Sequence, residues 1–343
     1  MAQINKPSEY FNTILYTGDG SSGRTINVGF QPDWVWYKER GSVDYHTVFD
    51  AIRGATKRMF PNDTDAEDTN TESLQSFVSN GYTVGNNSGT NGNGDNYVSW
   101  NWLASNTTAS NTDGSITSTV SANTTAGFSI VSYTGNGTGG ATVGHGLGQK
   151  PACIIVKRRS AAMNWGVYHQ SLASDEILQL DVTNAVYAGS GVFNATQPTA
   201  SVFYLGSGTA IDNDSGSTYI AYCFAEKKGF SKFGSYVGNN NADGTFVYTG
   251  FSPSFVLVKR YGGGTQNWVI YDNKRNTYNL TNSVLRPNTS DVEATNNGVD
   301  LLSNGFKFRS NDGDSNGYSD GYIYMAFAEN PLVGTNNIPA CAR

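Results

Sequence analysis

The segment DGDSNGYSDGYI, which starts at Asp312, carries oxygen-bearing side chains at the spacing of an EF-hand calcium loop. Asp312, Asp314 and Asn316 fall at positions 1, 3 and 5, a glycine falls at position 6, and Asp320 falls at position 9. Position 12 is Ile323 instead of the bidentate glutamate, and strands rather than helices are expected on both sides. The segment is therefore either a calcium site or a polar hairpin turn, and no other cofactor is predicted.

The turn interpretation draws support from similar polar stretches elsewhere in the chain. NGNGDN precedes Tyr97 and DNDSGS precedes Tyr219, each just before a strand like the one that follows Asp320. Three polar stretches in one structural position are explained by hairpin turns alone.

Two matched acidic pairs are the other candidates for chemistry. They are Asp65 with Glu67 and Asp291 with Glu293, each within a PN-x-[ST]-D-x-E segment. Paired carboxylates can hydrolyse a glycosidic bond, but capping and turn roles are commoner for such residues. The sequence contains no G-x-S-x-G, no phosphate-binding loop and no H-E-x-x-H. We predict that the protein is not an enzyme and assign no catalytic residue.

The histidines and cysteines give no sign of a metal site. His46, His145 and His169 lack the spacing of metal ligands. The three cysteines are an odd number and lie far apart, so they predict neither a disulfide framework nor a zinc site.

The composition indicates an all-β protein. The 343 residues include 40 glycines, 13% are aromatic and only 15% are charged, and long helical patterns are missing. The net charge is −6 and no basic cluster is longer than KRR, which argues against nucleic-acid binding. No stretch is long enough to span a membrane, and the N-terminus lacks the pattern of a signal peptide. We expect synthesis in a cytosol, with neither nucleic acid nor membrane as a partner.

The elements that must position these residues belong to a pattern that occurs three times. Each copy has a proline, a hydrophobic stretch and a lysine six residues after the proline, and each closes on a tyrosine-led strand. The copies read PDWVWYK from Pro32, PACIIVK from Pro151 and PSFVLVK from Pro253, and they close on YVSWNWLA from Tyr97, YIAYCFAE from Tyr219 and YIYMAFAE from Tyr322. We predict three tandem antiparallel β-sandwich repeats, jelly-roll-like, over residues 1–105, 106–226 (the divergent copy) and 227–343.

Two segments depart from this pattern. The stretch from Ser105 to Gly127 is rich in Ser, Thr and Asn and is interpreted as a linker, with a short alternating strand around Ile116 to Val120. A short helix is predicted around Asp65 to Ser79.

The stretch PDWVWYKER, from Pro32 to Arg40, could be an exposed aromatic platform for sugars or a buried strand. Trp34 and Trp36 share one face of this strand, and the other copies place Cys153 with Ile155 and Phe255 with Leu257 there. Core positions tolerate such exchanges because they require volume more than identity. The stretch therefore predicts a central buried strand, with the lysine stem along the core and its amine in water.

The closing strands have one bulky face and one small face. The bulky face is predicted to be buried, and Trp34, Trp100, Trp102 and Phe327 are its test residues. The small, uncharged face includes Ala221, Cys223, Ala326 and Ala328. Such a face suits close approach by another sheet, a loop or a neighbouring domain, and it suggests a stable oligomer or a subunit bound to other proteins.

The blocks YTGNG…GLGQKPACIIVK, GFQPDWVWYKER and DGTFVYTGFSPSFVLVKR resemble a tandem domain of virion proteins of tailed phages, above all marine phages. The resemblance covers nearly the whole chain. It implies a non-enzymatic virion protein: a tail fibre, tail appendage or head decoration, assembled in the host cytoplasm, that serves host-surface attachment or virion assembly. It also implies other virion proteins and a host-surface glycan as partners and a homo-oligomer, a trimer above all, but brings no catalytic motif. The alternatives are a tail-associated polysaccharide depolymerase and a free-standing lectin or adhesin.

Overall fold

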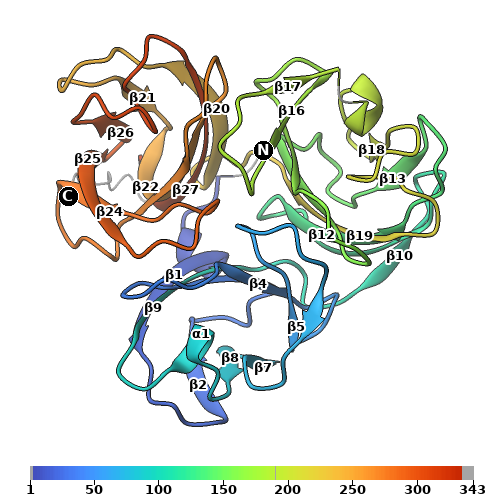
Figure 1. Ribbon diagram of the computed structural model, residues 1–343, viewed down its shortest axis with the longest axis horizontal. Helices are drawn as coiled ribbons and strands as arrows, with labels where there is room; N and C mark the ends of the chain where they lie inside the picture. Colours follow the sequence, from blue (N-terminus) through green and yellow to red (C-terminus); the bar gives the residue numbers. More distant parts are fainter. Residues whose placement is uncertain (1–2, 190, 334–343) are drawn as a thin grey trace.

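The computed structural model describes residues 3–189 and 191–333. Over these residues nearly all of the regular secondary structure is antiparallel strand, which confirms the predicted all-β class. Figure 1 shows three β-rich units around a common centre: the first in blue and cyan, the second in green and yellow, the third in orange and red. The predicted end of the third unit, residues 334–343, lies outside the described residues.

The first unit packs a four-stranded sheet on a three-stranded sheet, and side chains from both sheets form its internal core. The larger sheet has the order β1 (Phe11–Thr17), β9 (Asn96–Trp102), β3 (Trp34–Glu39) and β4 (Thr47–Asp50). The smaller has the order β2 (Arg24–Asn27), β8 (Gly81–Val84) and β7 (Leu74–Val78). A hairpin of β5 (Lys57–Arg58) and β6 (Asp68–Thr69), the turn η1 (Pro7–Glu9) and the helix α1 (Ser88–Asn91) complete the unit.

The second unit has a larger main sheet. Its order is β10 (Ala109–Asn111), β11 (Ser118–Asn123), β12 (Phe128–Thr134), β19 (Thr218–Phe224), β14 (Cys153–Arg158), β15 (Gly166–His169), β16 (Glu176–Gln179) and β17 (Tyr187–Ala188). A pair of short strands, β13 (Thr142–Gly144) and β18 (Val202–Tyr204), lies against it together with the turn η2 (Val192–Ala195).

The third unit is a sandwich of two four-stranded sheets with a core between them. One sheet has the order β20 (Ser231–Val237), β27 (Gly321–Pro331), β22 (Phe251–Arg260) and β23 (Trp268–Asp272). The other has the order β21 (Phe246–Tyr248), β26 (Gly305–Phe308), β25 (Ala294–Leu302) and β24 (Thr281–Val284).

The proline-to-lysine strand and the closing strand pair in the same register in every unit. The facing residues are Trp34 and Trp102, Cys153 and Phe224, and Phe255 and Phe327. The lysines six residues after the prolines therefore occupy equivalent places, opposite Val98, Ile220 and Ile323. The repeat in the sequence corresponds to one repeated strand arrangement in the structure.

The bulky faces of these strands meet at the centre of the molecule. One hydrophobic cluster contains side chains from all three units, among them Trp102, Phe224 and Phe327. Trp34, Trp100, Trp102 and Phe327 are each at most 1% exposed, so their predicted burial is confirmed. PDWVWYKER is a buried strand and not a sugar platform.

The small faces point the other way, into each unit's own sandwich. Ala221 and Cys223 belong to the core of the second unit, and Ala326 and Ala328 to that of the third. The small face is thus covered by the second layer of strands in the same unit. Of the three expected coverings, namely another sheet, a loop or a neighbouring domain, this is the first. Because no open small face is left at these residues, the sequence argument that linked this face to an oligomer does not hold, and the oligomer rests on the resemblance.

Two local predictions were wrong. The expected helix from Asp65 to Ser79 is instead β6, a turn and β7, because Leu74 to Val78 pairs with β8 as an edge strand. The expected linker from Ser105 to Gly127 is part of the second unit's main sheet: Val120 pairs with Val131 in β12. The alternating strand suggested within that segment is present as β11.

Candidate functional site

Several of the polar side chains singled out above lie at the three contacts between units, which we call the first–second, second–third and third–first seams. Backbone hydrogen bonds repeat from seam to seam. The amides of Asp44, Met163 and Gln266 donate to the carbonyls of Ser290, Thr64 and Thr183 over 3.0, 2.8 and 2.9 Å. Each unit contacts the preceding one in the same way, and the first contacts the third, so the three seams close a ring.

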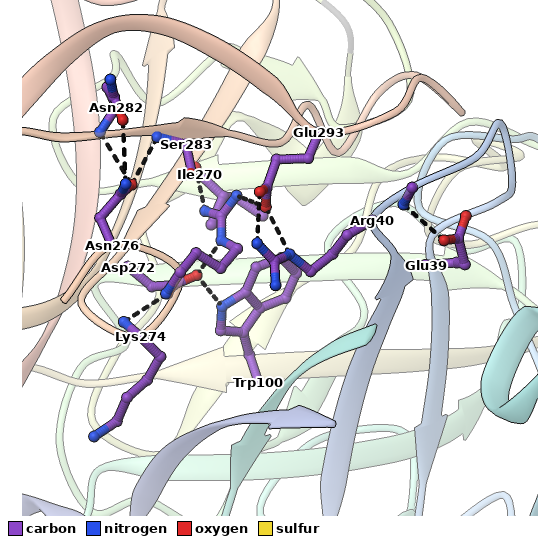
Figure 2. Close-up of polar contacts among 12 residues, drawn as sticks. Glu39, Arg40, Trp100, Ile270, Asp272, Lys274, Asn276, Asn282, Ser283 and Glu293 are labelled. Carbon is purple, nitrogen blue, oxygen red and sulfur yellow. Dashed lines mark hydrogen bonds and ion pairs between the residues drawn. The ribbon is translucent and has the colours of Figure 1, made fainter. Parts of the chain in front are cut away.

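The acidic residues of the two PN-x-[ST]-D-x-E segments have different roles. Glu293 pairs with Arg40 across the third–first seam, with Nη2 and Oε1 2.7 Å apart, and Figure 2 shows the two side chains meeting end to end. Glu67 pairs with Arg159 across the first–second seam at 2.8 Å. Asp65 and Asp291 are exposed. The members of each acidic pair therefore do not act together as an acid and a base would.

At the second–third seam the ion pair is replaced by apolar contact. The backbone amide of Val186 donates to the carbonyl of Tyr261 over 3.1 Å. The amides of Glu67 and Glu293 make the same bond to Arg159 and Arg40. Valine and tyrosine thus stand where the other seams have glutamate and arginine.

A second set of seam contacts involves buried carboxylates. The Tyr222 hydroxyl donates to Asp50 over 2.7 Å, and the Trp100 indole donates to Asp272 over 3.1 Å (Figure 2). Burial alone would raise the pKa of Asp272, but the Arg275 guanidinium beside it holds that pKa below its ordinary value. These carboxylates are paired inside the protein, which suits a structural role.

At the second–third seam a histidine takes the place of these carboxylates. His169 faces Cys153 as Asp272 faces Phe255, and its Nε2 lies 3.2 Å from the carbonyl oxygen of Tyr324. Burial lowers the pKa of His169 to about 4, so the ring is neutral at pH 7.

The other two histidines are also buried. His46 Nδ1 accepts a hydrogen bond from the Trp36 indole over 3.0 Å, and burial lowers the pKa of His46. His145 Nδ1 accepts from the amide of Leu147 over 3.2 Å, and burial lowers its pKa to about 4. All three rings have structural partners.

The repeated lysines are fully buried, contrary to the prediction that their amines reach water. The Lys157 amine donates to the carbonyl of Thr64 over 2.7 Å, and that of Lys259 to the carbonyl of Thr183 over 2.8 Å, each across a seam. Lys38 donates to carbonyls of its own unit. Burial lowers the pKa of Lys157 to about 8 and that of Lys259 to about 7. The neighbouring unit covers the strand end at which water was expected.

The acidic side chains of the candidate calcium loop form ion pairs and hydrogen bonds with other protein groups. Asp314 pairs with Arg286 at 3.1 Å and Asp320 with Arg260 at 2.8 Å. The Asp312 side chain accepts from the amide of Asp314 over 2.8 Å. Within residues 3–189 and 191–333, no group of three or more His, Cys, Asp or Glu could hold a metal ion. Calcium binding stays a prediction, and a calorimetric titration of chelator-treated protein tests it.

Asn316, the remaining residue of that loop, belongs to a repeated set. Its amide donates to the carbonyl of Ser310 over 2.8 Å, as the Asn91 amide donates to Gly85 over 3.0 Å and the Asn213 amide to Gly206 over 2.6 Å. Each of these asparagines lies six residues before the tyrosine that leads the closing strand. That constant spacing is a sequence signal for a structural asparagine, and the calcium interpretation overlooked it.

The sequence model of a family described as "Domain of unknown function (DUF7483)" matches residues 6–331. No curated protein and no solved structure matches the chain. None of the helices in the described part of the chain is long and apolar enough to cross a membrane.

Proposed function

The chain belongs to the DUF7483 domain family, and we propose that it is a non-enzymatic structural protein of a tailed-phage virion. In this proposal it forms part of a tail fibre or appendage and serves host-surface attachment or virion assembly. The reason for proposing a virion role is the resemblance of its repeated blocks to phage virion proteins.

The observation that supports it most is the way the units are locked together. All three contribute to one buried aromatic cluster, and two of the three repeated lysines and two arginine–glutamate pairs bridge neighbouring units. Such an arrangement favours a rigid block over domains that move around a reaction centre. A rigid block suits a particle component that must keep its shape under load.

The experiment is to locate the protein on particles. Phage particles purified from a host that carries the gene would be analysed by mass spectrometry and then labelled with gold-conjugated antibody against the chain. We expect the protein in the particle fraction and the label on tails, with pre-immune serum as the control. Label confined to heads would favour a decoration protein, and absence from purified particles would contradict the proposal.

A second experiment separates the proposal from its alternatives. Purified protein is incubated with surface polysaccharide of the host, and the polysaccharide is then sized by gel filtration. A structural or adhesive component leaves the chain length unchanged, whereas a depolymerase shortens it. Retention of polysaccharide by a protein that is absent from particles would instead indicate a free-standing lectin.

The oligomer is a separate part of the proposal. By analogy with the resembled proteins, a homotrimer or a complex with other virion proteins is expected in solution or on the particle. Light scattering distinguishes these states from a monomer of 36.8 kDa. A monodisperse monomer that does not join any virion fraction would refute it.

A further inference from the structure

The edge strand β21 of the third unit carries two exposed aromatic rings. It pairs with β26 on one side, and no strand within residues 3–189 and 191–333 pairs with its other side. Val247 points into the sandwich and is 6% exposed, whereas Phe246 and Tyr248 point outward and are 43% and 54% exposed. Apolar surface therefore lies along an edge that is open to a further strand.

Unpaired backbone groups accompany these rings. Thr245 accepts a backbone hydrogen bond from the last residue of β26 over 3.2 Å, and Thr249 donates one to the residue that precedes β26 over 2.9 Å. Bonded positions alternate along an antiparallel pair. The N–H and C=O groups of Phe246 and Tyr248 therefore face the free side of β21, where an additional strand would bond to them.

The same edge is polar in the first unit. β2 pairs with β8 as β21 pairs with β26, and the glycine that begins each partner strand faces Asn27 or Tyr248. Thr25 and Asn27 therefore stand where the third unit has Phe246 and Tyr248, and both are exposed. The first unit thus has an equivalent edge strand without the aromatic rings.

In the second unit the chain itself covers the equivalent edge. β13, which pairs with β18, has Thr142 and Gly144 at the outward positions. The Ile116 amide donates to the carbonyl of Thr142 over 3.0 Å, and Ile116 forms a parallel bridge with Val143. The Ser118 hydroxyl donates to the carbonyl of Gly144 over 2.9 Å. One extended segment thus bonds to the carbonyls whose counterparts in the third unit lie on the free side.

The third unit lacks this segment because the connection that leads into it is shorter. The covering segment lies in residues 103–127, which connect β9 to β12. One unit later, residues 225–230 connect β19 to β20, and the Phe230 amide donates to the carbonyl of Lys227 in a tight turn there. This turn leaves no residues for an additional strand, so a strand that covers β21 has to come from elsewhere.

The side chains on β21 indicate what such a strand carries. In the second unit the Thr142 hydroxyl accepts from the amide of Ser115, and the Ser115 hydroxyl accepts from the amide of Thr142, each over 2.9 Å. Phe246 at the equivalent place has no hydroxyl, and aromatic rings on a strand are stabilised by β-branched or aromatic neighbours. A strand that suits β21 therefore carries an apolar β-branched residue where the second unit has Ser115.

We propose that β21 binds an extended segment of another protein chain. The segment adds to the edge as a parallel strand, as Ile116 does at β13, and its outward-pointing β-branched side chains cover Phe246 and Tyr248. Backbone hydrogen bonds hold such a strand, and the side chains select it. The inference goes beyond the structural role proposed above and does not depend on it, because it follows from a comparison of the three units within the chain.

The test uses the full chain, labelled for NMR, and short peptides that are acetylated and amidated. The probe GVIVST is residues 114–119 with valine on both sides of Ile116. GVPVST is its control, since proline lacks the amide that Ile116 donates. Each peptide is added at up to about 5 mM, which reveals even millimolar affinity. We expect GVIVST to shift the amide signals of Phe246 and Tyr248, and GVPVST to leave them in place.

The first unit supplies an internal control. Thr25 and Asn27 occupy an equivalent edge without aromatic rings, so their amide signals should not move when GVIVST is added.

Variants examine the two rings. Phe246→Thr combined with Tyr248→Asn gives the third unit the residues of the first and should weaken binding of GVIVST tenfold or more. Tyr278→Asn removes another ring of the third unit, which is 76% exposed, and should bind as the unchanged protein does. Thermal melting verifies that both variants are folded. If the double variant does not fold, Tyr248→Asn alone and the amide shifts of the unchanged protein still decide.

Several results would overturn the proposal. They are no shift at Phe246 or Tyr248 with GVIVST, equal shifts with GVPVST, and undiminished binding by the double variant. Light scattering examines a second copy as the occupant: self-association of the unchanged protein that the double variant abolishes would assign the edge to that copy. A chain that ends at residue 333 examines residues 334–343, and binding of GVIVST only by this shorter chain would assign the edge to them.

Discussion

Trp102 contacts aromatic rings from its own unit and from the third. Its ring centroid lies 4.5 Å from that of Trp34 and 4.8 Å from that of Phe11, and 5.7 and 5.6 Å from those of Phe255 and Phe327. Rings at such distances gain energy beyond the area they bury. The residue therefore stabilises both a unit and a seam.

Trp102→Ala should lower the free energy of unfolding by roughly 3–5 kcal/mol, as for other large buried aromatics, because the cavity cannot close within a rigid ring of neighbours. Urea unfolding followed by circular dichroism measures the loss. Tyr278→Ala is the control, since Tyr278 is 76% exposed and its loss should change little. Equal stability of the Trp102 variant and the unchanged protein would show that the central cluster is not the core.

Lys259 makes stability depend on pH. Burial lowers its pKa from 10.5 to about 7 in the folded protein, so between these values the unfolded chain binds more protons than the folded one. Stability should therefore rise with pH across this window and be lost as pH falls through about 7. Lys259→Met should flatten the rise, as measured by urea midpoints from pH 6.5 to 10, whereas Lys228→Met, at an exposed position, should keep it. A rise that is unchanged in Lys259→Met would contradict the assignment.

Residue types alone predicted the buried tryptophans but not the buried lysines. An alternating strand with large side chains on one face indicates burial of that face, and Trp34 and Trp100 follow this rule. A lysine at a strand end normally extends its amine to water. Lys157 does not, because Thr64 of another unit covers the strand end, and a sequence read one copy at a time does not show that contact.

Strands and turns at the seams depend on ion pairs that are partly buried. Glu293 accepts hydrogen bonds from Arg40 at 2.7 Å and from Arg275 at 3.1 Å. Burial by itself would raise the pKa of Glu293, but these arginines hold it below the ordinary value. The carboxylate thus joins the residue that follows β3 in the first unit to the turn that follows β23 in the third.

Glu293→Gln should cost about 1.5–3 kcal/mol at pH 7, the range for hydrogen bonds to charged groups. Because its pKa is lowered on folding, the contribution is present above about pH 4.5 and is lost as pH falls further. Urea unfolding at pH 7 and at pH 3.5 measures both. Glu9→Gln removes an exposed pair with Lys6 and is the control, with an expected change below about 1 kcal/mol. A double-mutant cycle with Arg40 that shows no coupling would refute the seam contact.

At the scale of elements, the sequence predicted the repeated strands well and their partners poorly. The proline-to-lysine strand and the closing strand were predicted correctly because both recur in all three copies. Both also show strong alternation of large and small side chains. The segment from Asp65 to Ser79 was assigned to the wrong element because its polar residues fit a helix or an edge strand equally. The seams could not be predicted, because alternation identifies two faces of a strand but does not say which face another unit covers.

The whole molecule has a central core that all three units share, in addition to the core inside each unit. The cluster at the centre joins strands of every unit, and removing any unit would expose the aromatic faces of the other two. A cooperative transition is expected when elements share a core in this way. Treating each copy as a small independent domain, as its length suggests, therefore underestimates the coupling between copies.

Calorimetry of the full chain should show a single unfolding transition with a ratio of van't Hoff to calorimetric enthalpy near one. A fragment of residues 106–226 should be insoluble or unfolded, because Tyr222 and Phe224 would face water instead of the central cluster. A fragment of that range with an independent cooperative transition would contradict this prediction. So would three separable transitions in the full chain.

The closed ring of seams has a consequence for the order of the units along the chain. Residues near the two ends of the described part of the chain are neighbours: the Gln3 side-chain amide donates to the carbonyl of Val333 over 2.6 Å. The contact between the third and first units repeats the contact between the second and third units. The seams therefore do not depend on which unit comes first in the chain. A gene rearranged so that translation starts with the second unit and a short tether joins the old ends should yield the same packed ring. The stability of this fold should therefore depend on the three seams and not on which unit comes first in the chain.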